Sequence, residues 1–182
     1  MIWATLLAVG LSLAAGTTGA DQEDARLDGL FEALRSAEGG TTARATEASI
    51  WQLWIEHPDT AVQLLMRNGV AAMQRGDNRS ALEDFDQIVR IAPGFAEGWN
   101  KRATVHYLLG NYEDSLADID ETLALEPRHF GALSGRGLVY SALEDPERAL
   151  DAFEAALEVN PHMPGARSNA EALRKLLEGQ RI

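Results

Sequence analysis

Apolar side chains recur along most of this chain at the three- and four-residue spacing of amphipathic helices. Between residues 62 and 163 the pattern repeats every 34 residues without a gap, in the segments 62–95, 96–129 and 130–163. The eighth and twentieth positions of each segment are small, the twenty-fourth is bulky and the thirty-second is proline. These positions hold, in order, Gly69, Ala103 and Gly137; Ala81, Ser115 and Ala149; Phe85, Ile119 and Phe153; and Pro93, Pro127 and Pro161. A fixed period of this length indicates a repeat architecture.

Each segment is predicted to fold as two antiparallel helices. Helices approach each other closely only where their side chains are small, which the eighth and twentieth positions provide. A helix stop followed by an N-cap residue stands in the middle of each segment, at Gly76-Asp77, Gly110-Asn111 and Glu144-Asp145-Pro146. The proline near the end of each segment ends the second helix, because proline lacks the amide N–H that the helix needs.

This combination of period and residue types resembles the tetratricopeptide repeat family. The resemblance covers residues 62–163, more than half of the chain. It implies an all-α fold, an α-solenoid in which antiparallel helix pairs stack into a superhelix. Because no single pair buries its apolar face alone, the stack needs a cap at each end.

The segments on either side of the repeats are expected to be these caps. Residues 164–182 carry one apolar stripe and predict a C-terminal capping helix with a short tail. Residues 21–61 predict a helical hairpin, with helices over 23–37 and 42–56 that Gly39-Gly40 separates. We expect this hairpin to be a degenerate fourth pair that caps the first repeat.

Residues 1–20 predict an export signal. Residues 2–20 carry no charge, and small side chains precede Asp21, where we expect cleavage. No Lys or Arg precedes the apolar run, so an uncleaved membrane anchor is the alternative. The chain has no cysteine, which excludes a lipid-modified cysteine and disulfides. We therefore expect an exported protein, periplasmic in a bacterium, that touches a membrane only if this segment is retained.

The resemblance also implies a concave groove, lined by the first helix of each repeat, that holds a segment of a partner protein. The second, fifth, ninth, twelfth and thirteenth positions of each repeat commonly contact the partner. Here they hold Gln63, Met66, Val70, Met73 and Gln74; Glu97, Asn100, Thr104, Tyr107 and Leu108; and Gly131, Ser134, Leu138, Ser141 and Ala142. We expect Asn100 and Tyr107 to be the polar and the aromatic anchor. An alternative is that Met66, Val70 and Met73 pack under the N-terminal hairpin and never meet a partner.

Some relatives bind a partner's terminal carboxylate through Lys and Asn at the fifth and ninth positions. Those positions hold Met66 and Val70 in the first repeat and no lysine in the other two, so carboxylate-tail recognition is not expected. The seventh position departs from the family in holding Asn68, Arg102 and Arg136.

Because a polar group recurring in a seam needs a partner, we expect Arg102 and Arg136 to pair with Asp86, Asp118 and Asp120. The alternative is that Arg102, beside Lys101, receives an acidic group of a bound protein.

Charge and chemistry narrow the function further. The formal net charge of −12 and the sequence pI of about 4.7 disfavour nucleic acid and favour a basic or apolar partner. The histidines have no metal-ligand spacing; His129 and His162 are expected in exposed turns and His106 in a packed seam. We expect no cofactor, no metal and no small-molecule substrate.

The function that these observations favour is a non-catalytic protein-interaction scaffold. A structural self-associating module of an envelope complex is the alternative, with an exposed Trp51 or Trp54 surface as the homodimer contact. A third hypothesis is a hydrolase that acts through His106.

Overall fold

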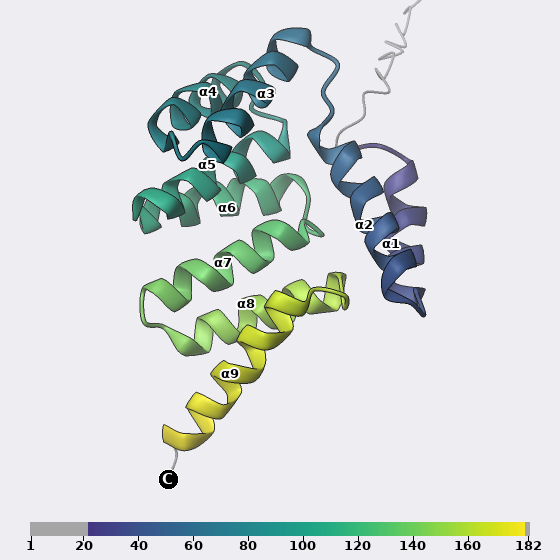
Figure 1. Cartoon of the computed structure of the whole chain (residues 1–182), viewed down its shortest axis with the longest axis vertical. Helices are drawn as coiled ribbons and strands as arrows, with labels where there is room; N and C mark the ends of the chain where they lie inside the picture. Colours follow the sequence, from purple (N-terminus) through teal and green to yellow (C-terminus); the bar gives the residue numbers. More distant parts are fainter. Residues whose placement is uncertain (1–21, 181–182) are drawn as a thin grey trace, which may run out of the picture.

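The computed structural model describes residues 22–180, and within this range the chain is all-α, with nine helices and no strand (Figure 1). The helices are α1 (Arg26–Ser36), α2 (Gly40–Ile55), α3 (Thr60–Gln74), α4 (Asn78–Ile91), α5 (Ala96–Leu109), α6 (Tyr112–Leu125), α7 (Phe130–Ala142), α8 (Pro146–Val159) and α9 (Pro164–Gln180). The expected signal segment, residues 1–20, lies outside the described residues. Among the described helices, none combines the length and the hydrophobicity that crossing a bilayer requires.

Six of these helices form the stacked pairs that the 34-residue period predicts: α3 with α4, α5 with α6, and α7 with α8. Each helix packs against its partner in the pair, and α4 and α6 also pack against the first helix of the next pair. Figure 1 shows the pairs following one another along the long axis of the molecule. The predicted fold, an all-α solenoid, is confirmed.

The small eighth positions explain how closely the paired helices approach. A Cβ added to Gly69 would lie 2.7 Å from ring atoms of Phe85, and one added to Gly137 would lie 2.8 Å from ring atoms of Phe153. In the second repeat Ala103 faces the smaller Ile119 in one buried cluster. The bulky twenty-fourth position of each repeat thus packs against the small eighth position.

The turn inside each repeat needs one residue with left-handed backbone geometry. These residues are Gly76 (φ 76°), Gly110 (φ 79°) and Glu144 (φ 58°). Glycine adopts this conformation freely, whereas Glu144 adopts it at a cost of about 1 kcal/mol. Asp77 and Asp145 cap the helices that follow by accepting the amides of Ser80 and Arg148. Asn111, which was predicted to do the same, makes no side-chain cap bond.

The last helix, α9, packs against α8 and closes the C-terminal end of the stack. Its Ala166 and Ala170 are buried in one cluster with Ala149 and Phe153 of α8. The C-terminal capping helix is therefore as predicted.

The N-terminal hairpin forms as predicted from α1 and α2, but it does not cap the first repeat. Both helices lie beside the stack, along the edge where one repeat passes into the next (Figure 1). Phe130, Val159 and Met163, all from the third repeat, belong to its core or pack against it. The hairpin lacks the repeats' pattern of small positions, which would let it stack closely on α3. Its bulky aromatic side chains pack across the inter-repeat turns instead.

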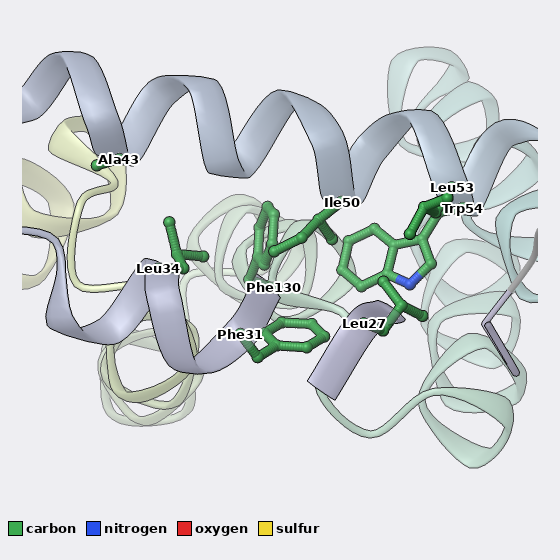
Figure 2. Close-up of a cluster of buried hydrophobic side chains, with 8 residues drawn as sticks. All are labelled: Leu27, Phe31, Leu34, Ala43, Ile50, Leu53, Trp54 and Phe130. Carbon is green, nitrogen blue, oxygen red and sulfur yellow. The ribbon is translucent and has the colours of Figure 1, made fainter. Parts of the chain in front are cut away.

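The hairpin core is closed by side chains of both its helices and by one side chain of α7. Figure 2 shows the residues of α1 and α2 pointing toward one another with Phe130 among them. The buried members are Leu27, Phe31, Leu34, Ala43, Ile50, Leu53, Trp54 and Phe130. Trp54 is 1% exposed and Trp51 is partly buried. The prediction that one of them forms an exposed surface for a homodimer contact is therefore wrong.

Candidate functional site

The second position of all three repeats, predicted to face a partner, meets the N-terminal hairpin or its linker. Gln63 Nε2 donates a hydrogen bond to His57 O at 2.6 Å, just after α2. Glu97 is only 1% exposed. A Cβ added to Gly131 would lie 2.5 Å from Trp51 Cη2, so the indole occupies the space of a larger side chain. The hairpin therefore lies over the start of α7 and against α5, while the linker that follows it contacts the start of α3.

His129 lies at the centre of this contact and is completely buried. Its Nδ1 accepts the Ala132 amide at 3.0 Å, and its Nε2 lies 3.0 Å from Glu97 Oε2. Because Nδ1 is an acceptor, the ring proton is on Nε2, which donates to Glu97. Trp54 stacks on the imidazole with ring centroids 4.1 Å apart and planes 12° apart. The prediction that His129 lies in an exposed turn is wrong, because it caps α7 beneath a tryptophan of α2.

Glu97 is held as a buried carboxylate by three neighbours. Lys101 Nζ lies 2.8 Å from its Oε1, and Asn100 Nδ2 donates to its Oε2 at 2.9 Å. Burial raises the pKa of Glu97, but the Lys101 ammonium and the hydrogen bond from His129 lower it further, to about 2. The Lys101 ammonium also lies 5.3 Å from the centre of the Trp51 ring. Glu97, Asn100 and Lys101 thus serve the contact with the hairpin.

Polar contacts extend the same interface along the edge of the stack. Arg128 Nη1 lies 2.6 Å from Asp28 Oδ1, and its guanidinium lies 4.4 Å from the centre of the Phe31 ring. Gln22 Nε2 donates to Gly94 O at 2.6 Å. The hairpin is therefore attached at the turns after the first and second repeats as well as over His129.

The remainder of the predicted groove is open, and we call it the open face. It consists of the later groove positions of α5 and α7, namely Thr104, Tyr107, Leu108, Ser134, Leu138 and Ser141. A hollow of about 210 Å³ lies in it, lined by Asn100 and by every member of the open face except Leu108 and Ser141. No lining residue has a charged side chain. The structure thus gathers five of the predicted site residues around one uncharged hollow.

The predicted groove residues of the first repeat lie elsewhere. Gln63, Met66 and Val70 line a separate hollow of about 470 Å³ between α3 and the end of α2, where Ile55 also contributes. Met66 is 3% exposed, and Val70 and Met73 pack with it in the core of the first repeat. These three residues therefore pack in a core made by α3, α4 and α5, and not under the hairpin as the alternative expected.

The arginines at the seventh position pair with aspartates of the second helices, as predicted. Arg102 donates two hydrogen bonds to Asp118, at 2.8 and 2.7 Å, and one to Asp86 at 2.9 Å. Arg136 pairs with Asp120. Both cations are satisfied within the chain, which supports the structural role over the reception of a partner's acid.

His106 and His162 both lie in partly buried surroundings. His106 is partly buried, with its ring nitrogens 3.9 Å from Asp114 and Asp118 carboxylate oxygens. His162, predicted to be exposed, is partly buried. Within residues 22–180 no three His, Asp or Glu side chains are grouped as metal ligands.

Sequence reasoning missed the role of His129, although the period contained a signal for it. The thirty-fourth position holds Phe95 in the first repeat and Met163 in the third, both apolar. Phe95 is 2% exposed. Because this position is apolar in two repeats, it predicts that His129, the equivalent residue of the second repeat, is buried as well. A buried histidine then needs polar partners such as Glu97.

Two family models, both described as Tetratricopeptide repeat, match residues 66–129 and 131–163. Together these matches cover more than half of the chain. A TPR repeat-containing protein of Rhizobium etli is 34% identical over 91 residues, which are 50% of this chain and 45% of the relative. The match therefore spans less than half of that protein's length.

Solved structures share the fold. The Sgt2 TPR domain from Aspergillus fumigatus is 25% identical with a TM-score of 0.64, over 69% of this chain and 85% of that one. The first TPR of Spaghetti (RPAP3), bound to the HSP90 peptide SRMEEVD, is 21% identical with a TM-score of 0.63, over 65% and 94%. MamA is 19% identical with a TM-score of 0.60, over 85% of this chain and 82% of that one.

Glu97→Gln is expected to change the acid stability of the protein. The pKa of Glu97 is about 2 in the folded chain against a usual 4.5, so its charge stabilises the fold above pH 4.5. This contribution, about 3 kcal/mol, is lost as the pH falls from 4.5 toward 2. Denaturant unfolding of both proteins from pH 2 to 7 measures it. The gap between them should widen up to pH 4.5 and then stay constant, whereas a variant of the exposed Glu121, Glu121→Gln, should follow the wild type. A constant gap at every pH would contradict an ionised Glu97.

Gly131→Ala is expected to loosen the hairpin without unfolding the repeats. The new Cβ would meet the Trp51 indole at 2.5 Å, and overpacking of this kind costs about 1–3 kcal/mol. Hydrogen exchange of the α1 and α2 amides should accelerate about tenfold or more, while the amides of α5 to α8 keep their protection. Gly135→Ala is the matched control on the same helix, because its Cβ would meet only Ile119 at an ordinary 3.9 Å. Equal protection of the hairpin in both variants would show that Trp51 does not anchor it.

Proposed function

The chain belongs to the tetratricopeptide repeat family, and from this premise we propose that it is a non-catalytic scaffold whose open face holds a segment of a partner protein. The single observation that carries the proposal is the uncharged hollow of about 210 Å³ between α5 and α7. Small-molecule sites occupy about 300–1,000 Å³, so a hollow of this size suits one or two side chains of a longer ligand.

The residues around the hollow suit a peptide. Thr104, Tyr107 and Ser134 offer hydroxyl groups, which can bond to the peptide backbone of a partner, while Leu138 and the Tyr107 ring offer apolar surface. Thr104 and Leu138 are exposed, and Tyr107 is partly so. Truncation of such anchors dominates the energetics of many protein interfaces.

Similar domains support a peptide as the ligand. The printed descriptions of two of them name a bound HSP90 peptide and a bound HSP70 peptide. The corresponding places here hold no lysine, and Asn100 is their only asparagine. We therefore propose an internal segment of the partner and not its C-terminal tail.

Self-association is the alternative function, but the surface that was expected to mediate it is not exposed. The tryptophan surface that would have formed the homodimer contact packs inside the chain instead, over His129 and Gly131. A self-associating module would need a different surface.

Photo-crosslinking in the native compartment tests the proposed groove. A photoreactive phenylalanine analogue at the exposed Thr104 should crosslink a partner, while the same analogue at Arg90, exposed on α4, should not. Leu138→Ala should weaken the association about five- to thirtyfold, as truncation of an interface anchor costs about 1–2 kcal/mol. Equal yields from both positions would contradict the groove, and crosslinks only between copies of this chain would favour self-association.

We also propose that the protein is exported, because residues 2–20 are uncharged and apolar and end in small side chains. Expression of the full sequence in a bacterium should yield a mature protein that begins at Asp21 and is released by osmotic shock. Retention of the first twenty residues in a membrane fraction would favour the anchor, and a full-length product in the cytosol would contradict export. A variant with Leu6 and Leu7 both changed to Glu is the control and should stay in the cytosol.

A further inference from the structure

A second hollow of different chemistry lies near the uncharged hollow of the open face. The second hollow, of about 280 Å³, lies at the turn between α5 and α6, where Leu143 of the next turn also lines it. Tyr107 lines the first hollow and Tyr112 the second, and their ring centroids are 5.9 Å apart. The two hollows therefore adjoin across a pair of tyrosines.

Two carboxylates give the second hollow its charge. Glu113 and Asp114 line it, and both are exposed. The nearest base recorded for Asp114 is His106, with Nδ1 3.9 Å from the carboxylate, while no Lys or Arg lines either hollow. The open face thus passes from an uncharged hollow to an acidic one.

The cations of these two repeats are already engaged elsewhere. Residues 96–163 contain five Lys or Arg side chains, and each of the five forms an ion pair. Their partners are Glu97 for Lys101, Asp118 and Asp86 for Arg102, Glu126 and Asp28 for Arg128, Asp120 for Arg136, and Asp145 for Arg148. None of these five cations pairs with Glu113 or Asp114, which leaves the charge of the second hollow available to a ligand.

Apolar surface accompanies this charge. Leu108, Leu109 and Leu143 are 51%, 43% and 42% exposed, and they lie at the ends of α5 and α7, beside the acidic hollow. The stem of a long basic side chain packs well on leucine and tyrosine while its charged end reaches a carboxylate. An arginine would in addition stack on a tyrosine ring.

We propose that the open face selects a partner segment that combines one bulky apolar residue with a Lys or Arg a few positions away. The apolar side chain enters the hollow between α5 and α7, and the basic side chain crosses the tyrosine pair to Glu113 and Asp114. An acidic segment is excluded, because it would place like charges together in a chain whose net charge is already −12. This inference rests on the proposed function and specifies the chemistry of its ligand.

Selection from a random library of twelve-residue peptides, displayed on phage with the full chain as bait, tests the proposal. Peptides whose capture is lost with Leu138→Ala should share a bulky apolar residue and a nearby Lys or Arg. A synthetic copy of the most enriched peptide then serves as the probe in fluorescence anisotropy. Its affinity should fall as salt rises, because exposed charges are screened.

Two double variants that each remove two negative charges distinguish the acidic hollow from the general acidity of the chain. Glu113→Gln with Asp114→Asn should weaken binding of that peptide about fivefold and flatten its salt dependence. Glu121→Gln with Glu158→Gln removes the same number of exposed charges from α6 and α8 and should leave binding unchanged. Thermal melting of both double variants shows whether either substitution disturbs the helices.

The two proposals fail in different ways. Groove-dependent peptides without a basic residue, or an affinity that survives Glu113→Gln with Asp114→Asn, would overturn the inference and leave the scaffold function standing. If no enriched peptide depends on Leu138, the peptide-binding function itself fails and the inference falls with it.

Discussion

The buried contact between Trp54, His129 and Glu97 sets the shape of the part of this protein that can meet a partner. An ionised carboxylate inside a protein is costly unless charge and hydrogen bonds compensate it, and here Lys101, Asn100 and His129 do so. The Trp54 ring stacks on the imidazole of His129, and a hydrogen bond in such dry surroundings is stronger than one in water. The hairpin and the buried charge therefore depend on each other.

Because of this contact, the early and the late positions of each groove helix differ in their exposure. Positions near the start of each first helix contact the hairpin or its linker, as Gln63 and Gly131 show, whereas later ones such as Thr104 and Leu138 are exposed. A partner that lay across the whole groove would have to displace α2 and strip Glu97 of its cover. The folded chain instead leaves exposed a short surface over the later turns of α5 and α7, which is where we propose that a partner segment binds.

The sequence was sufficient to predict the helix pairs of the repeats and the packing within them. The period of 34 residues located the helix pairs, because small and bulky residues such as Gly69 and Phe85 must alternate for the helices to touch. The pairing of Arg102 followed from the same period, since a polar residue in a seam requires a partner on the neighbouring helix. Where the hairpin docks could not be derived, because it occurs once, and a single amphipathic hairpin has no register that fixes its neighbour. The exposed groove residues were predicted, but which of them the hairpin would cover depended on that docking.

The same constraint explains why the charge of the open face is uneven. The chain has 28 acids and 16 bases, so a fold that pairs its bases internally leaves acids without basic partners somewhere on its surface. Lys101 serves the buried carboxylate and Arg128 holds the hairpin, while Arg102 and Arg136 join adjacent repeats. Each of these four cations therefore lies at a contact between helices of the repeats or at the contact with the hairpin. The turn between α5 and α6 belongs to neither. Carboxylates near the start of α6 are favoured there by the helix dipole, and none of the five Lys and Arg side chains of these repeats pairs with them. An acidic hollow beside an uncharged one is thus a consequence of how the repeats and the hairpin are held together.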